Sequence, residues 1–299
     1  MADVQHKGRE SKRLVKTRPL PLIWGVLNVT PDSFSDGGLY YEKERAIERG
    51  LELFEEGADV IDVGGASSRP RGPVYGEGAP LVPPEEEIRR VLPVIEGILK
   101  EKPEACISID TTAPEVALAA VESGARIVND VSMGASDALL ALCAERGVGL
   151  VLMHTRKDGR IDRDTTAYTD VLIDVRNELD QAIKRAAAFG VRPEQIWIDP
   201  GLGFAKSPEQ SMRLLAHLSG LKKRGERLLV GASRKFFLSV YGSASSTPEP
   251  PRERLGSSVG AALWAWLEGA DALRVHDVRF TAQALRLFQA LIALREEQA

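Results

Sequence analysis

The chain has 299 residues, of which 43% are hydrophobic and 27% are charged, a composition that suits one large domain or two small ones. Its net charge of −4 and pI of about 5.8 exclude a global basic surface for nucleic acid. No apolar run approaches the ~20 residues that a bilayer requires, so no membrane association is expected. We interpret residues 1–18, which are polar and mostly basic, as a flexible N-terminal tail before one domain at 19–299.

The domain opens with an apolar run at residues 22–27, which predicts a buried strand ending near Asn28. Pro31 then forbids a helix, and Gly37 and Gly38 permit unusual backbone angles. Phe34 is a large apolar side chain in this otherwise polar loop. Two interpretations stay open: a long turn whose Phe34 packs onto the core, or a lid that closes over Asn28.

Apolar runs and amphipathic segments alternate from here to the C-terminus. We expect strands at 22–27, 60–63, 106–109, 127–128, 149–153, 196–198, 228–230 and 272–275. Helices are expected at 42–56, 85–100, 114–124, 136–146, 168–189, 207–218, 252–268 and 281–297. Eight strand-then-helix units fit a single-domain (β/α)8 TIM barrel, and a doubly wound open sheet is the alternative.

A polar residue lies at or just past the C-terminal end of every expected strand. These residues are Asn28, Asp62, Asp110, Asn129, His154, Asp199, Ser233 and His276. In a barrel, the C-terminal strand ends converge on the face where such enzymes hold their active sites. We therefore expect these eight side chains to meet at one site.

Four of these residues follow apolar strand residues directly and should lie deep. They are Asp62, Asp110, Asn129 and Asp199. Each aspartate taken singly also fits a loop cap, but buried carboxylates need cations or N–H donors opposite them. Lys235 can neutralise one carboxylate, and a donor-rich ring such as an aminopyrimidinone can satisfy the others.

A second group is cationic and comes from the loops after strands two, seven and eight. Its members are Arg69, Lys235, Arg274 and His276. Convergent cations suit phosphate or carboxylate recognition, and residues 231–235 also look like a glycine turn into a helix N-terminus. No His and Cys cluster has zinc spacing, so any metal is expected to be oxygen-bound, such as Mg²⁺. The residues alone predict an enzyme that binds a donor-rich ring deep in a barrel and an anion at its rim.

The chain from residue 22 onward resembles the dihydropteroate synthases of the pterin-binding enzyme family. The matching segments are residues 27–38, 61–70, 108–111, 127–130, 152–154, 199–204, 233–235 and 274–277. Each is a weak signal alone, but all of them occur in order and at strand ends. The resemblance implies a pterin-binding TIM barrel that joins 6-hydroxymethyl-7,8-dihydropterin diphosphate to 4-aminobenzoate and releases diphosphate.

The resemblance also implies roles for individual residues. The pterin would be held by Asp110, Asn129, Asp199 and Lys235, and Asp62, Met153, Gly203 and Ser68 are also expected to contact substrate. The diphosphate would be held by Arg69, Arg274 and His276, and Asn28 would bind Mg²⁺. The aminobenzoate pocket would comprise Phe34, Arg69, Pro70, Phe204, Ser233 and Lys235. Expected catalytic residues are Asp36, which would stabilise a developing cation, with Lys235, Arg274 and His276.

Two positions depart from the family pattern, because Ala66 replaces the usual Glu and Ser68 replaces Thr. The loop at 71–84 is also longer than usual. Two alternatives therefore stay open: an inactive paralogue that binds pterin without turnover, and a pterin-binding methyltransferase domain. The second would not be expected to carry residues 233–235 or 274–277.

Trp264 and Trp266 predict a homodimer. Two residues apart on one helix, they point about 200° apart, so one should pack inside and the other be exposed or covered by a partner. Cys106 and Cys143 are interpreted as buried small hydrophobes in a reducing compartment, which favours a cytoplasmic location. Sulfonamides are expected to compete with 4-aminobenzoate.

Overall fold

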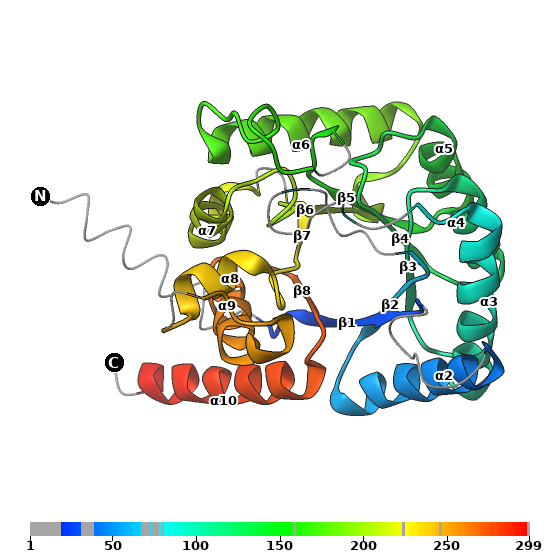
Figure 1. Ribbon diagram of the computed structural model, residues 1–299, viewed down its shortest axis with the longest axis horizontal. Coiled ribbons are helices and arrows are strands. Elements are labelled where there is room, and N and C mark those ends of the chain that lie inside the picture. Colours follow the sequence, from blue (N-terminus) through cyan, green and yellow to red (C-terminus); the bar gives the residue numbers. More distant parts are fainter. Residues whose placement is uncertain are drawn as a thin grey trace, which may run out of the picture.

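The computed structural model describes residues 19–30, 39–66, 72, 78, 81–157, 160–222, 225–244 and 247–297. Parallel strands β1 to β8 close into a barrel, and helices surround it on all sides (Figure 1). The TIM barrel is confirmed, and the open-sheet alternative is wrong because β8 pairs with β1. The predicted tail at residues 1–18 lies outside the described residues.

Strands and helices alternate along the chain, except that two helices follow β7 and short 3₁₀ turns precede β6, β7 and α9. They are β1 (Leu22–Asn28), α2 (Leu39–Glu56), β2 (Val60–Gly64), α3 (Pro84–Glu101), β3 (Ile107–Asp110), α4 (Pro114–Glu122), β4 (Ile127–Asp130), α5 (Asp137–Arg146), β5 (Gly149–Met153), α6 (Val171–Ala188), η3 (Pro193–Gln195), β6 (Ile196–Asp199), α7 (Pro208–Ala216), η4 (Leu218–Gly220), β7 (Arg227–Val230), α8 (Phe236–Gly242), η5 (Pro251–Glu253), α9 (Leu255–Leu267), β8 (Ala272–Val275) and α10 (Val278–Glu297). Within the described residues, none of these helices is long and apolar enough to cross a membrane.

Local capping explains several helix boundaries. Asp170 precedes α6, and its carboxylate accepts hydrogen bonds from the backbone N–H groups of Leu172 and Ile173 at 2.9 and 3.2 Å. Ser207 precedes α7 and exchanges hydrogen bonds with Gln210 in a capping box. The expected starts of these helices therefore fall on or near their caps.

The largest difference from expectation lies after β7. Residues 231–235 were expected only to lead into a helix N-terminus, whereas a complete extra helix, α8 (Phe236–Gly242), follows them directly. The next helix was expected from residue 252, but residues 251–253 form the 3₁₀ turn η5 and α9 begins at Leu255. Unit seven of the barrel thus contains two helices (Figure 1).

Side chains alternate between the two faces of each strand. Outward side chains such as Ile61 and Val63 join the large apolar cluster between barrel and helices. The inward side chains of the N-terminal half form a second cluster: Trp24, Val60, Ile127, Val151, Trp197, Leu229 and Ala272. The rings of Trp24 and Trp197 meet edge to face with centroids 5.4 Å apart. This apolar layer fills the N-terminal half of the barrel.

Candidate active site

The next inward position on each strand beyond the apolar layer carries most of the expected site residues. Each of these residues lies two positions after an inward apolar residue of its own strand. They are Asp62, Asn129, Met153, Asp199 and Arg274. Asp110 occupies the equivalent position on β3, two residues after the buried Ser108. Because strand side chains alternate with a period of two, the barrel brings these residues together above the apolar layer.

Arg274 is the centre of this group. Its Nε donates to Asp62 Oδ2 at 2.6 Å and its Nη2 donates to Asp110 Oδ2 at 2.7 Å. Asn129 Nδ2 also donates to Asp62 Oδ2, at 3.0 Å. The deep carboxylates and the cations, which were expected to form separate groups, are therefore joined directly through Arg274. In the described part of the chain, Asp62 Oδ1 is buried without a hydrogen-bond partner, so an acceptor remains for a ligand.

The charged side chains of this group shift one another's pKa values. Burial raises the pKa of Asp110 to about 7; Arg274 opposes that shift, and the neighbouring Asp62 carboxylate adds to it. Burial alone would lower the pKa of Arg274, but the carboxylates of Asp62 and Asp110 raise it overall. The guanidinium is thus a permanent cation, whereas Asp110 exchanges a proton near neutral pH.

Asp199 faces the same space from β6. Its Oδ1 accepts the backbone N–H of Gly201 at 2.7 Å. Burial raises its pKa, and Lys235 is the strongest opposing charge. Lys235 Nζ donates to the carbonyl of Leu202 at 2.5 Å and lies 4.9 Å from the centre of the Phe204 ring. Burial lowers the pKa of Lys235 to about 8, so its charge also responds to a ligand near neutral pH.

Ser233 and His276 meet at the rim. The Ser233 hydroxyl lies 3.0 Å from His276 Nδ1 and accepts the His276 backbone N–H at 3.3 Å. Burial, with Arg274 and Arg234 nearby, lowers the pKa of His276 to about 3. Without a bound anion, burial and the neighbouring arginines thus favour a neutral His276, and its expected role as a cation at the diphosphate stays a prediction.

Arg234 fixes the loop that carries Ser233 and Lys235. It has a positive φ of 60°, and its Nε donates to Asp277 Oδ2 at 3.0 Å. Its backbone N–H donates to Ser258 Oγ at 2.9 Å, and its carbonyl accepts from Arg254 Nη1 at 2.8 Å. Loop seven is thus tied to loop eight and to the start of α9.

Five expected site residues lie outside the described residues, namely Phe34, Asp36, Ser68, Arg69 and Pro70. The choice between a lid and a packed turn for Phe34 therefore stays a prediction. Asn28 is exposed at the end of β1, on the side of Gly64. Among the residues that are described, no three His, Cys, Asp or Glu side chains are grouped to hold a metal ion.

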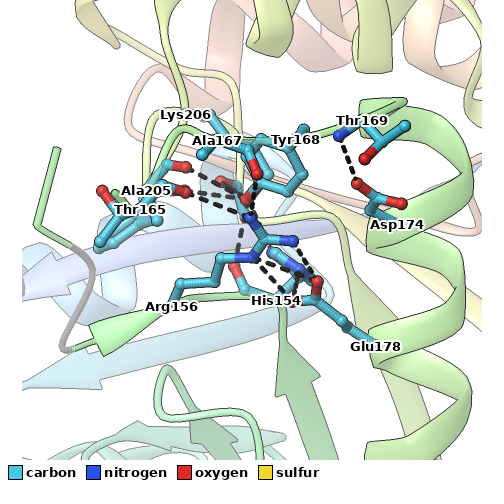
Figure 2. Close-up of polar contacts among 12 residues, drawn as sticks. His154, Arg156, Thr165, Ala167, Tyr168, Thr169, Asp174, Glu178, Ala205 and Lys206 are labelled. Atoms are coloured by element: carbon cyan, nitrogen blue, oxygen red, sulfur yellow. Dashed lines mark hydrogen bonds and ion pairs between the residues drawn. The ribbon is translucent and has the colours of Figure 1, made fainter. Parts of the chain in front are cut away.

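His154 does not join the site, so the expectation that all eight strand-end residues converge is wrong for this one. It follows the inward Met153, and alternation points it outward, where it is fully buried against α6. Figure 2 shows it between Glu178 and Lys206. Its Nε2 lies 3.0 Å from Glu178 Oε2, and its Nδ1 lies 2.8 Å from Lys206 Nζ.

The sequence analysis did not identify this cluster. Glu178 also binds Arg156, whose guanidinium stacks 3.8 Å from the centre of the Tyr168 ring. The Tyr168 hydroxyl donates to the carbonyl of Ala205 at 3.1 Å. The cluster therefore joins the loop after β5 to the turn after β6. The alternation of side chains along β5 could have predicted that His154 points outward. Nothing in the sequence near Lys206 indicates that its side chain is buried.

Comparison with known proteins shows the family to which this chain is similar. The family model described as pterin binding enzyme matches residues 24–276. A dihydropteroate synthase of Mycobacterium leprae is 43% identical over 275 residues, which cover 91% of this chain and 93% of that protein.

Solved structures give the same result. A Xanthomonas albilineans dihydropteroate synthase with 4-aminobenzoic acid has a TM-score of 0.82 and 42% identity, covering 92% of this chain and 94% of that one. A structure of that bacterium's enzyme with 7,8-dihydropteroate has a TM-score of 0.79 and 40% identity, with coverages of 92% and 94%. The similarity therefore extends over nearly the whole of each chain.

Proposed function

We infer that this chain, which belongs to the pterin-binding enzyme family, is a dihydropteroate synthase. It joins 6-hydroxymethyl-7,8-dihydropterin diphosphate to 4-aminobenzoate and gives 7,8-dihydropteroate and diphosphate. The observation that carries this conclusion is the inward set of Asp62, Asp110, Asn129 and Asp199 around Arg274. Such a set matches the N–H donors and acceptors of an aminopyrimidinone ring. The relatives are synthases, so the methyltransferase alternative has no support among them.

The deep residues bind the pterin. Asp199 accepts from the amino and ring N–H groups, while Asp110 and Asn129 meet the opposite edge of the ring. Lys235, between Asp199 and the Phe204 ring, donates to the pterin from the side of loop seven. Asp62 Oδ1 and Met153 complete the floor of this pocket.

The reaction exchanges a C–O bond for a C–N bond at the pterin methylene. The departing diphosphate takes the electron pair of the C–O bond, and the aniline nitrogen supplies the pair of the new bond and then loses a proton. An aniline is weakly basic, so this step needs no strong dedicated base. The enzyme orients the two substrates, excludes water and stabilises the diphosphate. From the resemblance we assign Arg69 and His276, with Arg274, to the diphosphate, and Asp36 to stabilising cationic character at the methylene.

Mg²⁺ fits this site as an ion brought with the diphosphate. Asn28 offers one amide oxygen at the barrel mouth, and Mg²⁺ commonly binds one or two protein oxygens together with substrate phosphates. When bound, the ion neutralises charge on the leaving group. The pairing of the end of β1 with β2, where Asn28 lies opposite Gly64, fixes the position of Asn28.

The aminobenzoate site lies at the rim. We assign Phe204, Ser233 and Lys235 of the barrel to it, and the resemblance adds Phe34, Arg69 and Pro70. The resemblance also adds Gly203 and Ser68 as substrate contacts. A sulfonamide copies the aniline ring and the anionic end of 4-aminobenzoate, so this pocket also binds sulfonamides.

The enzyme is a homodimer that assembles through α7, α8 and α9. Trp266 is 2% exposed and Trp264 is 46% exposed, which confirms that the two rings face different environments. A mostly apolar groove of about 470 Å³ lies between these three helices, with Trp264 and Tyr241 in its wall. A second copy is the occupant that such an exposed apolar surface favours. Two free cysteines, Cys106 and Cys143, support a cytoplasmic location.

The reaction itself tests the assignment. Purified protein is incubated with the pterin diphosphate and 4-aminobenzoate, with and without Mg²⁺, and released diphosphate is measured. We expect turnover only when both substrates are present, and more of it with Mg²⁺. Binding of the pterin diphosphate without any diphosphate release would instead identify an inactive paralogue, which Ala66 leaves open.

A further inference from the structure

Lys206 is a lysine whose side chain is buried outside the substrate site. It is 1% exposed and is the last residue of the turn at residues 200–206; Figure 2 shows it in the cluster with His154. Its Nζ is 2.8 Å from His154 Nδ1, 3.1 Å from the Gly201 carbonyl and 2.9 Å from the Phe204 carbonyl. An ammonium group has three protons, and a buried one is stable only if all three have acceptors. A fourth and longer contact of 3.5 Å joins Nζ to the His154 carbonyl, so each of the three protons has an acceptor within reach.

The protonation state and tautomer of His154 decide whether its Nδ1 can be one of those acceptors. Its Nε2 faces Glu178, which also accepts from Arg156 Nε at 3.2 and 3.1 Å. Burial opposes ionisation of Glu178, but hydrogen bonds from His154 and Arg156 outweigh it and lower the pKa to about 2. A carboxylate can only accept, so His154 carries its proton on Nε2. Burial lowers the pKa of His154 to about 4, so the ring is neutral and Nδ1 is an acceptor.

Lys206 must therefore donate to all three partners. Burial lowers its pKa well below the ordinary value, which favours a neutral amine. A neutral amine has two protons and would point its lone pair at one of three acceptors. Among the charges that face Lys206, Asp199 and Glu178 favour the ammonium form, whereas Lys235 and Arg156 oppose it. We propose that Lys206 is a buried ammonium ion that positions the turn carrying Gly203 and Phe204 and keeps Asp199 ionised for pterin binding.

Gly201 connects Lys206 to Asp199. Asp199 Oδ1 accepts the Gly201 N–H at 2.7 Å, while Lys206 donates to the carbonyl of the same residue. Gly201 has a φ of +62°, and a Cβ there would lie 1.9 Å from the His154 carbonyl oxygen, so the turn packs directly on the end of β5. Lys235 and Arg274 face Asp199 from the site side, and Lys206 is the cation behind it.

Lys206→Met removes the charge and keeps the length of the side chain. The proposal rests on the proposed function, because it assigns pterin binding to Asp199. We expect the affinity for pterin diphosphate, measured by calorimetry without aminobenzoate, to fall at least about tenfold at neutral pH. The pH at which binding is lost on acidification should move upward, because Asp199 becomes easier to protonate. A folded variant with wild-type affinity and an unchanged pH midpoint would overturn the proposal.

Glu178→Gln provides the test if Lys206→Met does not fold. The glutamine keeps the shape but can accept from or donate to His154 Nε2, so it no longer fixes the tautomer. We expect a smaller loss of affinity than in Lys206→Met and a shift of the pH midpoint in the same direction. Arg185→Gln is the matched control on α6, because it removes only exposed contacts, an ion pair with Asp137 and a hydrogen bond to the Ala135 carbonyl. Lower stability without a shift in midpoint would indicate a merely structural role and contradict the proposal.

Nitrogen-15 spectra of the imidazole rings test the proposal without substrate. We expect His154, assigned by its loss in His154→Gln, to be neutral with its proton on Nε2 at neutral pH. A proton on Nδ1, or a cationic ring at neutral pH, would overturn the proposal whether or not the protein makes dihydropteroate. Absence of pterin binding in the wild type, together with an Nε2–H tautomer, would instead contradict the proposed function.

Discussion

Lys206 and Lys235 donate to carbonyl groups of the same turn: Lys206 binds Gly201 and Phe204, and Lys235 binds Leu202 between them. Lys206 approaches from the buried side of the turn, and Lys235 approaches from the barrel interior. The turn is thus held by cations on both sides. Its conformation therefore depends on charges that lie in two different environments.

Asp199→Asn should weaken pterin binding much more than aminobenzoate binding. A carboxylate can accept from the Gly201 N–H and from two ligand N–H groups, whereas an amide offers one oxygen. The loss should be roughly 1–3 kcal/mol, the effect of one unpaired buried donor. Calorimetry of the variant with pterin diphosphate measures it, and unchanged affinity would contradict the role assigned to Asp199.

Arg274→Met should destabilise the barrel as well as abolish activity. It leaves Asp62 and Asp110 as buried carboxylates without their cation, which costs roughly 3–5 kcal/mol of unfolding free energy at neutral pH. The defect should shrink in acid, because the carboxylates then become neutral. Arg274→Lys is the control: it keeps the charge but cannot span both carboxylates, so an intermediate loss is expected. Denaturant unfolding that gave equal losses at acid and neutral pH would argue against this ion-pair group.

The stability of the protein should fall in acid partly because of His154. Its pKa is lowered from 6.5 to about 4 by burial, so below pH 6.5 the unfolded chain binds a proton that the folded chain does not. The stabilisation is complete above pH 6.5 and is lost as the pH falls toward 4, with a slope approaching about 1.4 kcal/mol per pH unit. His154→Gln should reduce this slope in denaturant unfolding, and His217→Gln, at an exposed position, should not. Identical slopes in all three proteins would refute the assignment.

Trp264→Glu should convert the proposed dimer to a monomer. The side chain lies at the apolar groove between α7, α8 and α9, where a buried carboxylate would be unpaired. Light scattering at micromolar concentration gives the mass. Leu118→Glu, on α4 at the far side of the barrel, is the control and should remain dimeric (Figure 1). A monomeric wild-type protein would remove the proposal.

A simple sulfonamide should inhibit competitively with 4-aminobenzoate. Steady-state kinetics with both varied give the pattern, and inhibition should be strongest with diphosphate and Mg²⁺ bound, when Phe34 completes the pocket. Ala66 and Ser68 lie close enough in sequence to Arg69 to alter the inhibition constant. A noncompetitive pattern would mean that the rim pocket is built differently.

Strand order and most of the inward residues could be predicted from the sequence, because both depend on a strict period. The eight apolar runs defined the barrel, and the polar residue after each run defined its mouth. The same period would also have excluded His154, which directly follows the inward Met153. The helix α8 gave a weaker signal, because seven mostly apolar residues are too short to show a helical repeat.

The contacts of Arg274 and Lys206 required the structure. Arg274 reaches Asp62 and Asp110 because the strands tilt in the closed barrel and bring β8 close to β2 and β3. No local pattern encodes that distance. Lys206 ends a turn of glycine and apolar residues, and a lysine in a loop is normally solvated; the packing of this turn on β5 buries it.

Trp24 and Trp197 block the lower end of the barrel, and Arg227 stacks on the Trp197 ring at 4.3 Å. The barrel is therefore closed at the N-terminal ends of its strands. With the pterin at Asp199 and aminobenzoate at Ser233, as proposed, we expect the pterin to bind first. The two halves, once joined, have to leave together. We expect substrates and product to pass the same rim, and an inhibitor bound at the rim to slow release of the pterin beneath it.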